Sequence, residues 1–403
     1  MPGPFEGVKI LEVAEFVAMP SAIAIMADWG AEVVKIENPQ GGDSYRGLTS
    51  FGGVALKDVP IWFEQSNRNK RSVTIDLWKE EGREILYKLV KDADVFVTNF
   101  TIPVVNRFEI DYETLSKLNP RIVYGSLTGY GKNGPEKDKP GYDFAAFWAK
   151  SGIMSRLGEP GTPPPTQRGA LGDNLTAGFI AGAVAAALYS VEKTGEGQAI
   201  DFSLFHYGVW GLSLDIMTAL NQAEEIPRTE RKKAPNPLWN TYETKDGIWL
   251  QLVCLQSDRY WPQFCVALGI EDLRDDSRFN SHETRDRNSV ELISIIESKI
   301  SEMTYEELEK AFSKAGEIIY SRVHTPLELV EDPQALANDF FAELEHPVGK
   351  NVKYISTPAR FSKTPASIRS TAPELGQHTE EVLIESGYTW EEIIAFKDKQ
   401  IIL

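Results

Sequence analysis

Asp173 is the side chain with the clearest capacity for chemistry, because of what stands on either side of it. A turn with two glycines, Gly169-Ala-Leu-Gly172, precedes it, and an uncharged run of small and apolar residues follows as far as Glu192. Free N–H groups and the helix dipole at a helix start stabilise negative charge. Asp173 is therefore either an ordinary helix cap or a carboxylate nucleophile that forms an acyl intermediate. Composition alone does not choose between the two.

The run after Asp173 predicts a long helix. Alanine favours helix, and larger apolar residues recur at helical spacing, at Phe179, Ile180, Val184 and Leu188. Gly178 and Gly182 leave a smooth face against which another backbone can press closely. The stretch 174–191 is uncharged, but it is rich in small residues and barely reaches the ~20 apolar residues of a membrane span. We interpret it as a helix of the protein interior.

Other chemical motifs are incomplete in this sequence. Gly129-Tyr-Gly131-Lys-Asn-Gly134 matches GxGxxG, but Pro135 and a charged run follow it, so a loop is favoured over a dinucleotide site. The sequence contains no GxxxxGK[ST] and no GxSxG motif. The five histidines and two cysteines lack metal-ligand spacing, so no metal site is predicted. Cys254 and Cys265 are expected to be reduced core thiols.

Length and charge exclude some classes of function. With 403 residues the chain is long enough for two or more domains, and 42% apolar residues are typical of a globular protein. The net charge of −17 argues against nucleic-acid binding, so an anionic ligand would need a local basic patch. The start, MPGPFEGVKI, lacks the basic region and apolar core of a signal peptide, and we expect a cytoplasmic protein without membrane contact.

Strands alternate with helices along the first two hundred residues. Predicted strands cover 8–13, 31–36, 72–77, 94–98, 122–127 and 197–204, and predicted helices cover 20–29, 80–91 and 112–118. This alternation predicts an α/β fold with a mainly parallel sheet. Ligands of such sheets bind beyond the carboxyl ends of the strands. Those ends are predicted at 14–17, 37–38, 99–100 and 128–131.

Composition changes after the helical stretch 206–221. A charged linker is predicted at 222–233, followed by a hairpin around Lys245-Asp-Gly247 and helices at 258–268, 289–301 and 305–315. Further elements are expected at 353–355, 379–386 and 391–399. We therefore predict a large Rossmann-like domain over 1–205, a helix and linker over 206–234, a smaller α+β domain over 235–325, and a return segment over 326–403 that completes the large domain.

An ordered series of short motifs resembles the class III coenzyme A transferases, the formyl-CoA and carnitine CoA-transferase family. The resemblance runs nearly end to end and is specific because of its order. Its motifs are Gly7-Val-Lys-Ile-Leu11, Ala18-Met-Pro20, Asp28 to Glu37, Gly42-Asp43, Asn69-Lys-Arg-Ser72, Ala93-Asp94, Asn99-Phe100, Gly172-Asp173, Gly195-Glu-Gly-Gln198, Asn236-Pro237, Lys245-Asp-Gly247 and Ala372 to Thr379.

Within this family the chain is similar to the members that activate 2-hydroxy acids, such as phenyllactate and 2-hydroxyisocaproate, in amino-acid fermentation. Leu11 to Ala18, Pro140-Gly-Tyr-Asp143 and Asn236-Pro-Leu238 carry this finer likeness. It implies acyl-CoA and carboxylic acids as substrates, no tightly bound cofactor, an interlocked homodimer, and a functional link to a 2-hydroxyacyl-CoA dehydratase.

The resemblance also implies roles for particular residues. Asp173 falls at the catalytic aspartate of the family, which forms a mixed anhydride and then a CoA thioester. Positions that contact CoA or border the catalytic pocket in the family fall on Val17, Ala18, Ile75, Asn99, Phe100, Arg107, Phe108 and Tyr142, and Lys139 lies one position from a CoA-binding lysine of some members. Arg107 is the expected phosphate partner, and Ile75 lies at the adenine position. Lys70 and Arg71 are either further cations for CoA or a solvated basic pair.

Three departures from the family pattern bear on the substrate. Oxalate-specific members have glutamine where this chain has Val17, so a small dicarboxylate is less expected. The glycine-rich lid of those members has no counterpart in 234–240. An arginine of some members is Asn38 here, for which Arg46 is a candidate substitute. Four aromatic residues are candidates for an acid pocket, with ordinary core packing the favoured interpretation: Phe144, Phe147, Trp148 and Trp239.

Two other functions fit the same resemblance. An α-methylacyl-CoA racemase needs a second base facing the aspartate, and racemases place histidine where this chain has Tyr142. A tyrosine of ordinary pKa, ~10, is a poor base at neutral pH. A catalytically inactive CoA-binding or scaffold protein would be marked by loss of the aspartate, and Asp173 is present. The transferase is the favoured hypothesis.

Overall fold

The structure, a computed structural model, describes residues 3–403 and divides into two compact units. The first unit comprises the chain up to Ser155 together with Thr166–Glu224 and Leu336–Leu403. The second comprises Arg156–Pro165 and Glu225–Ala335, and the predicted small domain, 235–325, lies within it. The sequence pattern gave no indication that the short segment Arg156–Pro165 belongs to the second unit.

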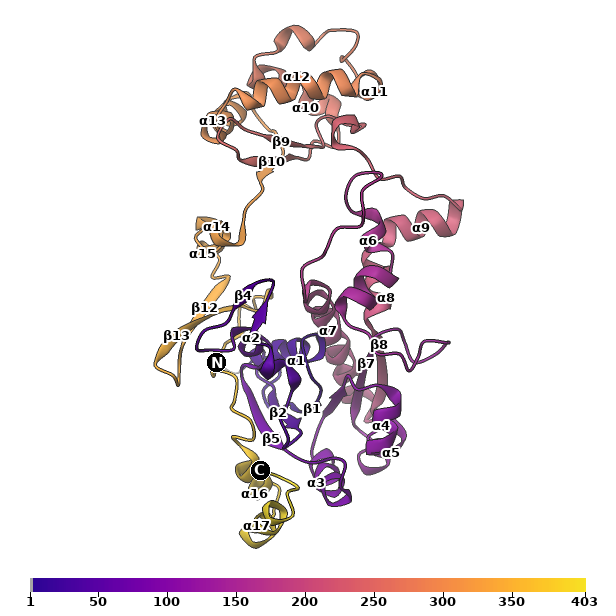
Figure 1. The fold of residues 1–403 in the computed structure, drawn as a ribbon, viewed down its shortest axis with the longest axis vertical. Helices are drawn as coiled ribbons and strands as arrows, with labels where there is room; N and C mark the ends of the chain where they lie inside the picture. Colours follow the sequence, from indigo (N-terminus) through magenta and orange to yellow (C-terminus); the bar gives the residue numbers. More distant parts are fainter. Residues whose placement is uncertain (1–2) are drawn as a thin grey trace. The chain divides into compact units, whose positions relative to one another are not determined.

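A six-stranded parallel sheet forms the centre of the first unit (Figure 1). Its spatial order is β5-β2-β1-β6-β7-β8, the strand order of doubly wound dinucleotide-binding folds. The predicted α/β fold with a parallel sheet is confirmed. The strands are β1 (Lys9–Val13), β2 (Glu32–Glu37), β5 (Lys70–Thr74), β6 (Val95–Thr98), β7 (Val123–Thr128) and β8 (Gln198–Ser203).

The third strand begins and ends earlier than the predicted range 72–77. Register pairs Val33 with Lys70 and Glu37 with Thr74, so β5 starts with two basic residues. Polar residues at a strand start look like a loop in sequence, but the Lys70 ammonium is fully buried and ion-paired, which keeps this segment in the sheet. The chain leaves the sheet at Asp76, whose N–H donates to the carbonyl of Ile401.

Helices cover both faces of this sheet. Apolar residues of one face pack with α3, α4, α5 and the C-terminal helices α16 and α17, while α1 and α7 pack together and lie against the strands of the sheet. The bounds are α1 (Ala18–Asp28), α2 (Ile61–Asn67), α3 (Glu80–Val90), α4 (Ile102–Phe108), α5 (Tyr112–Leu118), α6 (Ile153–Arg156), α7 (Leu171–Thr194), α8 (Leu204–Gly211), α9 (Ser213–Gln222), α16 (Thr379–Glu385) and α17 (Trp390–Asp398). Phe144–Lys150 is a π-helix.

The long helix α7 has two unlike faces. Residues at helical spacing from Thr176 through Ile180 and Val184 to Val191 are buried. Leu175, Phe179 and Tyr189 on the other side are more than half exposed, so the expected fully interior helix is wrong for one face. By length and composition α7 could cross a membrane. Because its buried face packs against α1, we assign it as a core helix.

The second unit has its own small sheet and core. The predicted hairpin is present as β9 (Thr241–Glu243) and β10 (Trp249–Leu252), and β11 (Tyr320–Arg322) pairs with β10, all antiparallel. Helices α10 (Ser257–Leu268), α11 (His282–Arg287), α12 (Ser289–Ser301) and α13 (Tyr305–Ala315) complete its apolar core, with α14 (Pro326–Leu329) and α15 (Pro333–Ala337) after it. Cys254 and Cys265 are buried free thiols of this unit.

The return segment contains an antiparallel pair of strands, of which the sequence pattern predicted only one. β12 (Phe341–His346) pairs with β13 (Lys350–Ile355), whereas only a strand at 353–355 was predicted. Another short hairpin, β3 (Ser50–Phe51) with β4 (Val54–Ala55), was not predicted. The return segment meets α2 through Glu64, which accepts hydrogen bonds from the Tyr354 hydroxyl at 2.6 Å and the Ala372 N–H at 2.9 Å.

A buried ion network lies beneath the carboxyl ends of the first strands. Lys35 Nζ is 2.8 Å from Glu12 Oε1 and 2.9 Å from Asp43 Oδ2, and Lys70 Nζ is 2.6 Å from Glu12 Oε2. All four side chains are inaccessible to solvent or nearly so. Burial by itself lowers the pKa of Lys35, but the carboxylates of Asp43 and Glu12 outweigh it, so the net shift is upward and the ammonium stays charged. The network thus joins β1, β2, β5 and the loop after β2.

We predict that Lys35→Met destabilises the fold by about 3–5 kcal/mol, because Glu12 and Asp43 would lose a buried counter-ion. Denaturant unfolding at neutral pH measures the change. Lys117→Met on the exposed side of α5 is the matched control and should leave the midpoint nearly unchanged. Equal, small effects of both substitutions would contradict a structural role of the network.

Candidate active site

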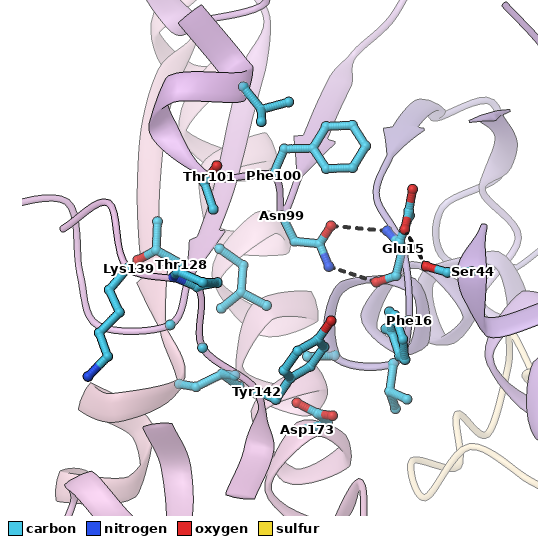
Figure 2. A pocket seen from close by; sticks show the side chains of 18 of the residues that line it. Glu15, Phe16, Ser44, Asn99, Phe100, Thr101, Thr128, Lys139, Tyr142 and Asp173 are labelled. Atoms are coloured by element: carbon cyan, nitrogen blue, oxygen red, sulfur yellow. Dashed lines mark hydrogen bonds between the residues drawn. The ribbon is translucent and has the colours of Figure 1, made fainter. Parts of the chain in front are cut away.

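A cavity of about 280 Å³ opens where β1 and β6 lie side by side at the switch point of the sheet. It is lined by residues that follow β1, β6 and β7 and by the first turn of α7 (Figure 2). The lining residues are Glu15, Phe16, Val17, Ala18, Ser44, Asn99, Phe100, Thr101, Val104, Leu127, Thr128, Gly129, Lys137, Lys139, Pro140, Gly141, Tyr142, Asp173 and Leu204.

Asp173 is a partly buried carboxylate on this cavity. Within residues 3–403, no side chain donates a hydrogen bond or supplies a counter-ion to it. Burial, and secondarily the negative charge of Asp143, raise its pKa to about 7. It does not act as the side-chain cap of α7, whose N-cap position is Ala170. An unpaired carboxylate with this pKa is about half ionised at neutral pH and retains high basicity when it ionises.

Asp143 is a second, deeper carboxylate beside the start of α7. Its side chain is 3% exposed, and Oδ2 accepts a hydrogen bond from Trp148 Nε1 at 3.3 Å. Burial raises the pKa of Asp143 to about 6, although Trp148 and the nearby N–H groups of the α7 turn partly oppose this. A Cβ on Gly172 would lie 2.2 Å from Asp143 Oδ1, so only glycine allows the helix start to approach this carboxylate.

The loop after β1 is fixed by hydrogen bonds from two other elements. Glu15 and Asn99 pair reciprocally: the Glu15 N–H donates to Asn99 Oδ1 at 3.0 Å, and Asn99 Nδ2 donates to the Glu15 carbonyl at 2.7 Å. The Phe16 N–H donates to Asp43 Oδ1 at 3.0 Å, and the Ser44 hydroxyl donates to Glu15 Oε2 at 2.6 Å. Figure 2 shows the Glu15–Asn99 pair above Asp173 in that view. The cavity therefore has a rigid wall on this side.

A second cavity of about 260 Å³ adjoins the first, since Glu15, Phe100 and Val104 line both. Ile75 and Phe108 belong to its apolar lining. Trp78 also lines it, and the exposed Arg107 guanidinium lies over the Trp78 ring at 4.5 Å from the centroid. An apolar cleft with an arginine close to it suits a flat heteroaromatic ring and a phosphate group.

The structure gathers the residues that were carried over from the family. Val17, Ala18, Asn99, Phe100, Lys139, Tyr142 and Asp173 line the first cavity, and Ile75, Phe100 and Phe108 line the second. Arg107 stands beside the second cavity through its contact with Trp78. Lys139 pairs with Glu136 at 3.2 Å, and Figure 2 shows its ammonium directed away from Asp173.

Several basic candidates lie elsewhere. Lys70 belongs to the buried network, and Arg71 pairs with Glu381 and Glu385 on α16, so neither lines a cavity with Asp173. Arg46 is held by Glu37 at 2.8 Å. Sequence spacing did not reveal these pairings because each joins side chains from different elements of the fold.

The aromatic candidates also separate. Phe147 and Trp148 are buried in the core, and Phe144 is 39% exposed on the same π-helix. Trp239 is 58% exposed in the second unit. Sequence reasoning missed Phe16, Tyr45 and Asp143 as neighbours of the site. The motifs Leu11 to Ala18 and Pro140 to Asp143 contain Phe16 and Asp143, but a motif does not show which side chains face a cavity. Among residues 3–403 no cluster of three or more potential ligands could hold a metal ion.

The fold and the cavity are those of an α/β enzyme, with its ligand site at the topological switch point. The chain belongs to CoA-transferase family III: the family model with that description matches residues 5–379. The resemblance seen in the sequence is confirmed.

Curated relatives match over almost the whole chain. Cinnamoyl-CoA:phenyllactate CoA-transferase of Clostridium sporogenes is 35% identical, covering 99% of this chain and 97% of the relative. (R)-2-hydroxy-4-methylpentanoate CoA-transferase of Clostridioides difficile is 34% identical, covering 98% and 99%. Succinyl-CoA–D-citramalate CoA-transferase of Chloroflexus aurantiacus is 30% identical, covering 100% and 98%. A solved CAIB/BAIF family protein from Brucella suis superposes with a TM-score of 0.83 at 30% identity, covering 96% and 100%.

If Asp173 is the group that attacks the thioester, we predict that acylation of the enzyme accelerates as pH rises through about 7, because only the ionised carboxylate is a nucleophile. Asp143→Asn removes the neighbouring negative charge, which lowers the pKa of Asp173 and moves this transition to lower pH. Rapid-quench intact-mass measurement of the covalent enzyme intermediate across pH 5–9 tests both points.

The exposed carboxylate Asp138, in the loop that carries Lys139, provides the matched control. Asp138→Asn should leave the midpoint of the pH profile in place. A midpoint that stays unchanged in Asp143→Asn would refute the charge coupling between the two aspartates.

Proposed function

We propose that this CoA-transferase moves coenzyme A from an acyl-CoA donor to a 2-hydroxy acid, with Asp173 as the covalent nucleophile. The observation that carries the proposal is the Asp173 carboxylate, which lines the cavity at the end of the parallel sheet without a counter-ion among residues 3–403. A salt-bridged carboxylate would be a poor nucleophile, because its lone pairs would be engaged and its basicity lowered.

The reaction proceeds through two covalent intermediates. A carboxylate oxygen of Asp173 attacks the donor thioester carbonyl, the C–S bond breaks, and a mixed anhydride and CoA thiolate form. The thiolate attacks the aspartyl carbonyl and releases the donor acid, leaving an aspartyl-CoA thioester. The acceptor carboxylate attacks that thioester to give a second anhydride, and CoA thiolate then takes the acyl group, which restores the Asp173 carboxylate. Each step conserves charge and needs no added proton or oxidant.

Coenzyme A is assigned to the two adjoining cavities. Its adenine suits the apolar second cavity at Ile75 and Phe108, with Arg107 as the nearest cation for a phosphate. The pantetheine arm would follow Phe100 and Asn99 into the first cavity, where Val17 and Ala18 flank the thioester near Asp173. Backbone N–H groups of the tight loop after β1 are candidates to stabilise the oxyanions that form.

The relatives support a 2-hydroxy acid as the acceptor. Two relatives at 34–35% identity are named for phenyllactate and 2-hydroxy-4-methylpentanoate, both of which carry an apolar side chain. Relatives named for succinate with citramalate or glutarate match at 30–32% identity. Val17 in place of a glutamine removes an amide donor beside Asp173 and is consistent with an apolar acid.

We predict that an acyl-CoA labels Asp173 and no other residue. Incubation with cinnamoyl-CoA followed by hydroxylamine converts the aspartyl anhydride or thioester to a hydroxamate, which peptide mass spectrometry locates. Asp173→Asn should abolish both the label and turnover, while the near-isosteric side chain leaves the fold intact, as circular dichroism would show. Label at another position, or undiminished turnover of Asp173→Asn, would refute the proposal.

We propose further that the chain works as a homodimer through an exposed apolar face on α7, α8 and α9. This α7–α9 face consists of Leu175, Phe179, Tyr189, Trp210, Leu214, Met217 and Leu220, which are 52–79% exposed. The Phe179 and Tyr207 rings lie 5.3 Å apart and connect α7 with α8. Large apolar side chains exposed on three successive helices are typical of a subunit interface.

Sedimentation velocity is expected to show a dimer that persists on dilution to nanomolar concentration. Leu214→Asp, at a side chain that is 79% exposed, should shift the population toward monomer because it places a charge in the apolar interface. Ile394→Asp on α17, at a side chain that is 56% exposed, is the control and should leave the dimer unchanged. A wild-type protein that sediments as a monomer at micromolar concentration would contradict the homodimer.

A further inference from the structure

Phe16 has a backbone conformation that its residue type rarely adopts. Its φ is 63°, in the left-handed region, where a bulky side chain is strained and glycine is not. Among residues 3–403, seven non-glycine residues have positive φ, and Phe16 is the aromatic one. Such strain concentrates at functional sites because the surrounding structure must enforce it.

The enforcement comes from both sides of the residue. The Phe16 N–H donates to Asp43 Oδ1, and the same oxygen accepts the Tyr45 N–H at 2.9 Å. Asp43 is 1% exposed and is anchored through Oδ2 by Lys35, so it cannot move without disturbing the buried network. On the other flank, the Glu15 peptide is held at both its N–H and its carbonyl by the Asn99 amide.

The strained backbone places the Phe16 ring at the edge of the Asp173 cavity. The ring lies 5.7 Å from the Tyr45 ring and 5.3 Å from the Tyr142 ring, in a T-shaped contact with the latter. Tyr45 is close enough to Asp173 for the carboxylate to contribute to raising the pKa of the Tyr45 phenol to about 12, although burial is the larger cause. Figure 2 shows Phe16 and Tyr142 beside Asp173.

We infer that Phe16 is a specificity-determining residue: its ring forms the wall against which the side chain of the transferred acid packs, and Asp43 positions it. This inference rests on the proposed function and adds to it the residue that selects the acid. Glycine would adopt the same backbone without strain, so the position is explained by what the ring contacts rather than by the turn.

The surroundings of the ring favour an apolar acid side chain. Val17, Leu127 and Leu204 line the same cavity as Phe16. Two lysines, Lys137 and Lys139, line the same cavity, and Lys139 is paired with Glu136 and directed away from Asp173. A second carboxylate on the acid would therefore depend on Lys137. Donor and acceptor acids occupy the same place in turn, because both are joined to Asp173. The Phe16 wall should therefore select an aryl or branched aliphatic side chain on each of them.

The test compares the full-length enzyme with Phe16→Gly on an acceptor panel, with cinnamoyl-CoA as the donor. Phenyllactate and 2-hydroxy-4-methylpentanoate represent apolar acids, and succinate represents dicarboxylates. We expect kcat/KM for phenyllactate relative to succinate to fall on the order of 10- to 100-fold in Phe16→Gly, because one ring contact is lost. Thermal stability should be retained, because glycine relieves the backbone strain.

Two further variants separate the ring from the backbone. Asparagine tolerates a left-handed conformation and has no aromatic ring, so Phe16→Asn should show the same fall in the phenyllactate-to-succinate ratio. This variant also provides the test if Phe16→Gly fails to fold. Phe16→Leu keeps apolar volume and should lose less of the preference for apolar acids than either. A phenyllactate-to-succinate ratio that changes less than about threefold in Phe16→Gly and Phe16→Asn would overturn the inference.

The outcomes distinguish this inference from the proposed function. If wild-type protein labels at Asp173 and transfers CoA, but the acceptor ratio ignores position 16, only the role of Phe16 fails. If wild-type protein transfers CoA but prefers succinate over both apolar acids, the role of Phe16 in selecting apolar acids also fails. If Asp173 is never labelled and no acid accepts CoA, the proposed function fails first and the inference falls with it.

Discussion

The buried network of Glu12, Lys35, Lys70 and Asp43 is the constraint on which the rest of the site depends. Two cations and two anions balance one another in a space that excludes water, where an unmatched charge would be costly. The network ties three parallel strands to the loop after β2. Asp43 then passes this rigidity to the loop after β1 through its hydrogen bond with the Phe16 N–H. A surface ion pair would not achieve this, because solvent and side-chain entropy would loosen it.

Asp173 contrasts with the carboxylates of this network. Glu12 and Asp43 have counter-ions, whereas Asp173 faces a cavity and has a second carboxylate, Asp143, as its neighbour. Burial and the neighbouring negative charge both disfavour the ionised form of Asp173. A carboxylate that served stability alone would instead have a counter-ion. In the proposed mechanism acylation would remove this charge, so the environment that penalises the free carboxylate would favour the covalent intermediates. The glycine at position 172 makes the close approach of the two aspartates possible.

Helix α7 joins the Asp173 cavity to an exposed apolar face. Its first turn carries Asp173, its buried face packs against α1 and the sheet, and its remaining face is apolar yet exposed. An exposed apolar face of this kind is typical of an interaction surface, and it is the basis of the proposed homodimer. The small residues that resembled an interior pattern in the sequence thus belong to a helix of which one face is buried and the other is exposed.

The sequence by itself determined the elements whose signals are local. Alternating strands and helices predicted the parallel sheet, apolar periodicity placed α7, α12 and α13 closely, and an ordered series of motifs predicted the CoA-transferase family. These inferences succeed because periodicity and motif order are read along the chain. The start of β5 was predicted two residues too late, because the sequence does not distinguish a lysine with a buried partner from a lysine in solvent.

Only the tertiary structure decided which side chains meet. Lys70 faces Glu12 rather than a phosphate, Asp143 lies against Gly172, and Phe16 is twisted into a cavity by an aspartate 27 positions further along the chain. Charge pairing, cavity lining and backbone strain depend on groups that are close in space and far apart in sequence. For that reason the residue types indicated the chemistry, whereas the packing of the strands and loops determined that Asp173 has no counter-ion among residues 3–403 and that the Phe16 ring lies beside it.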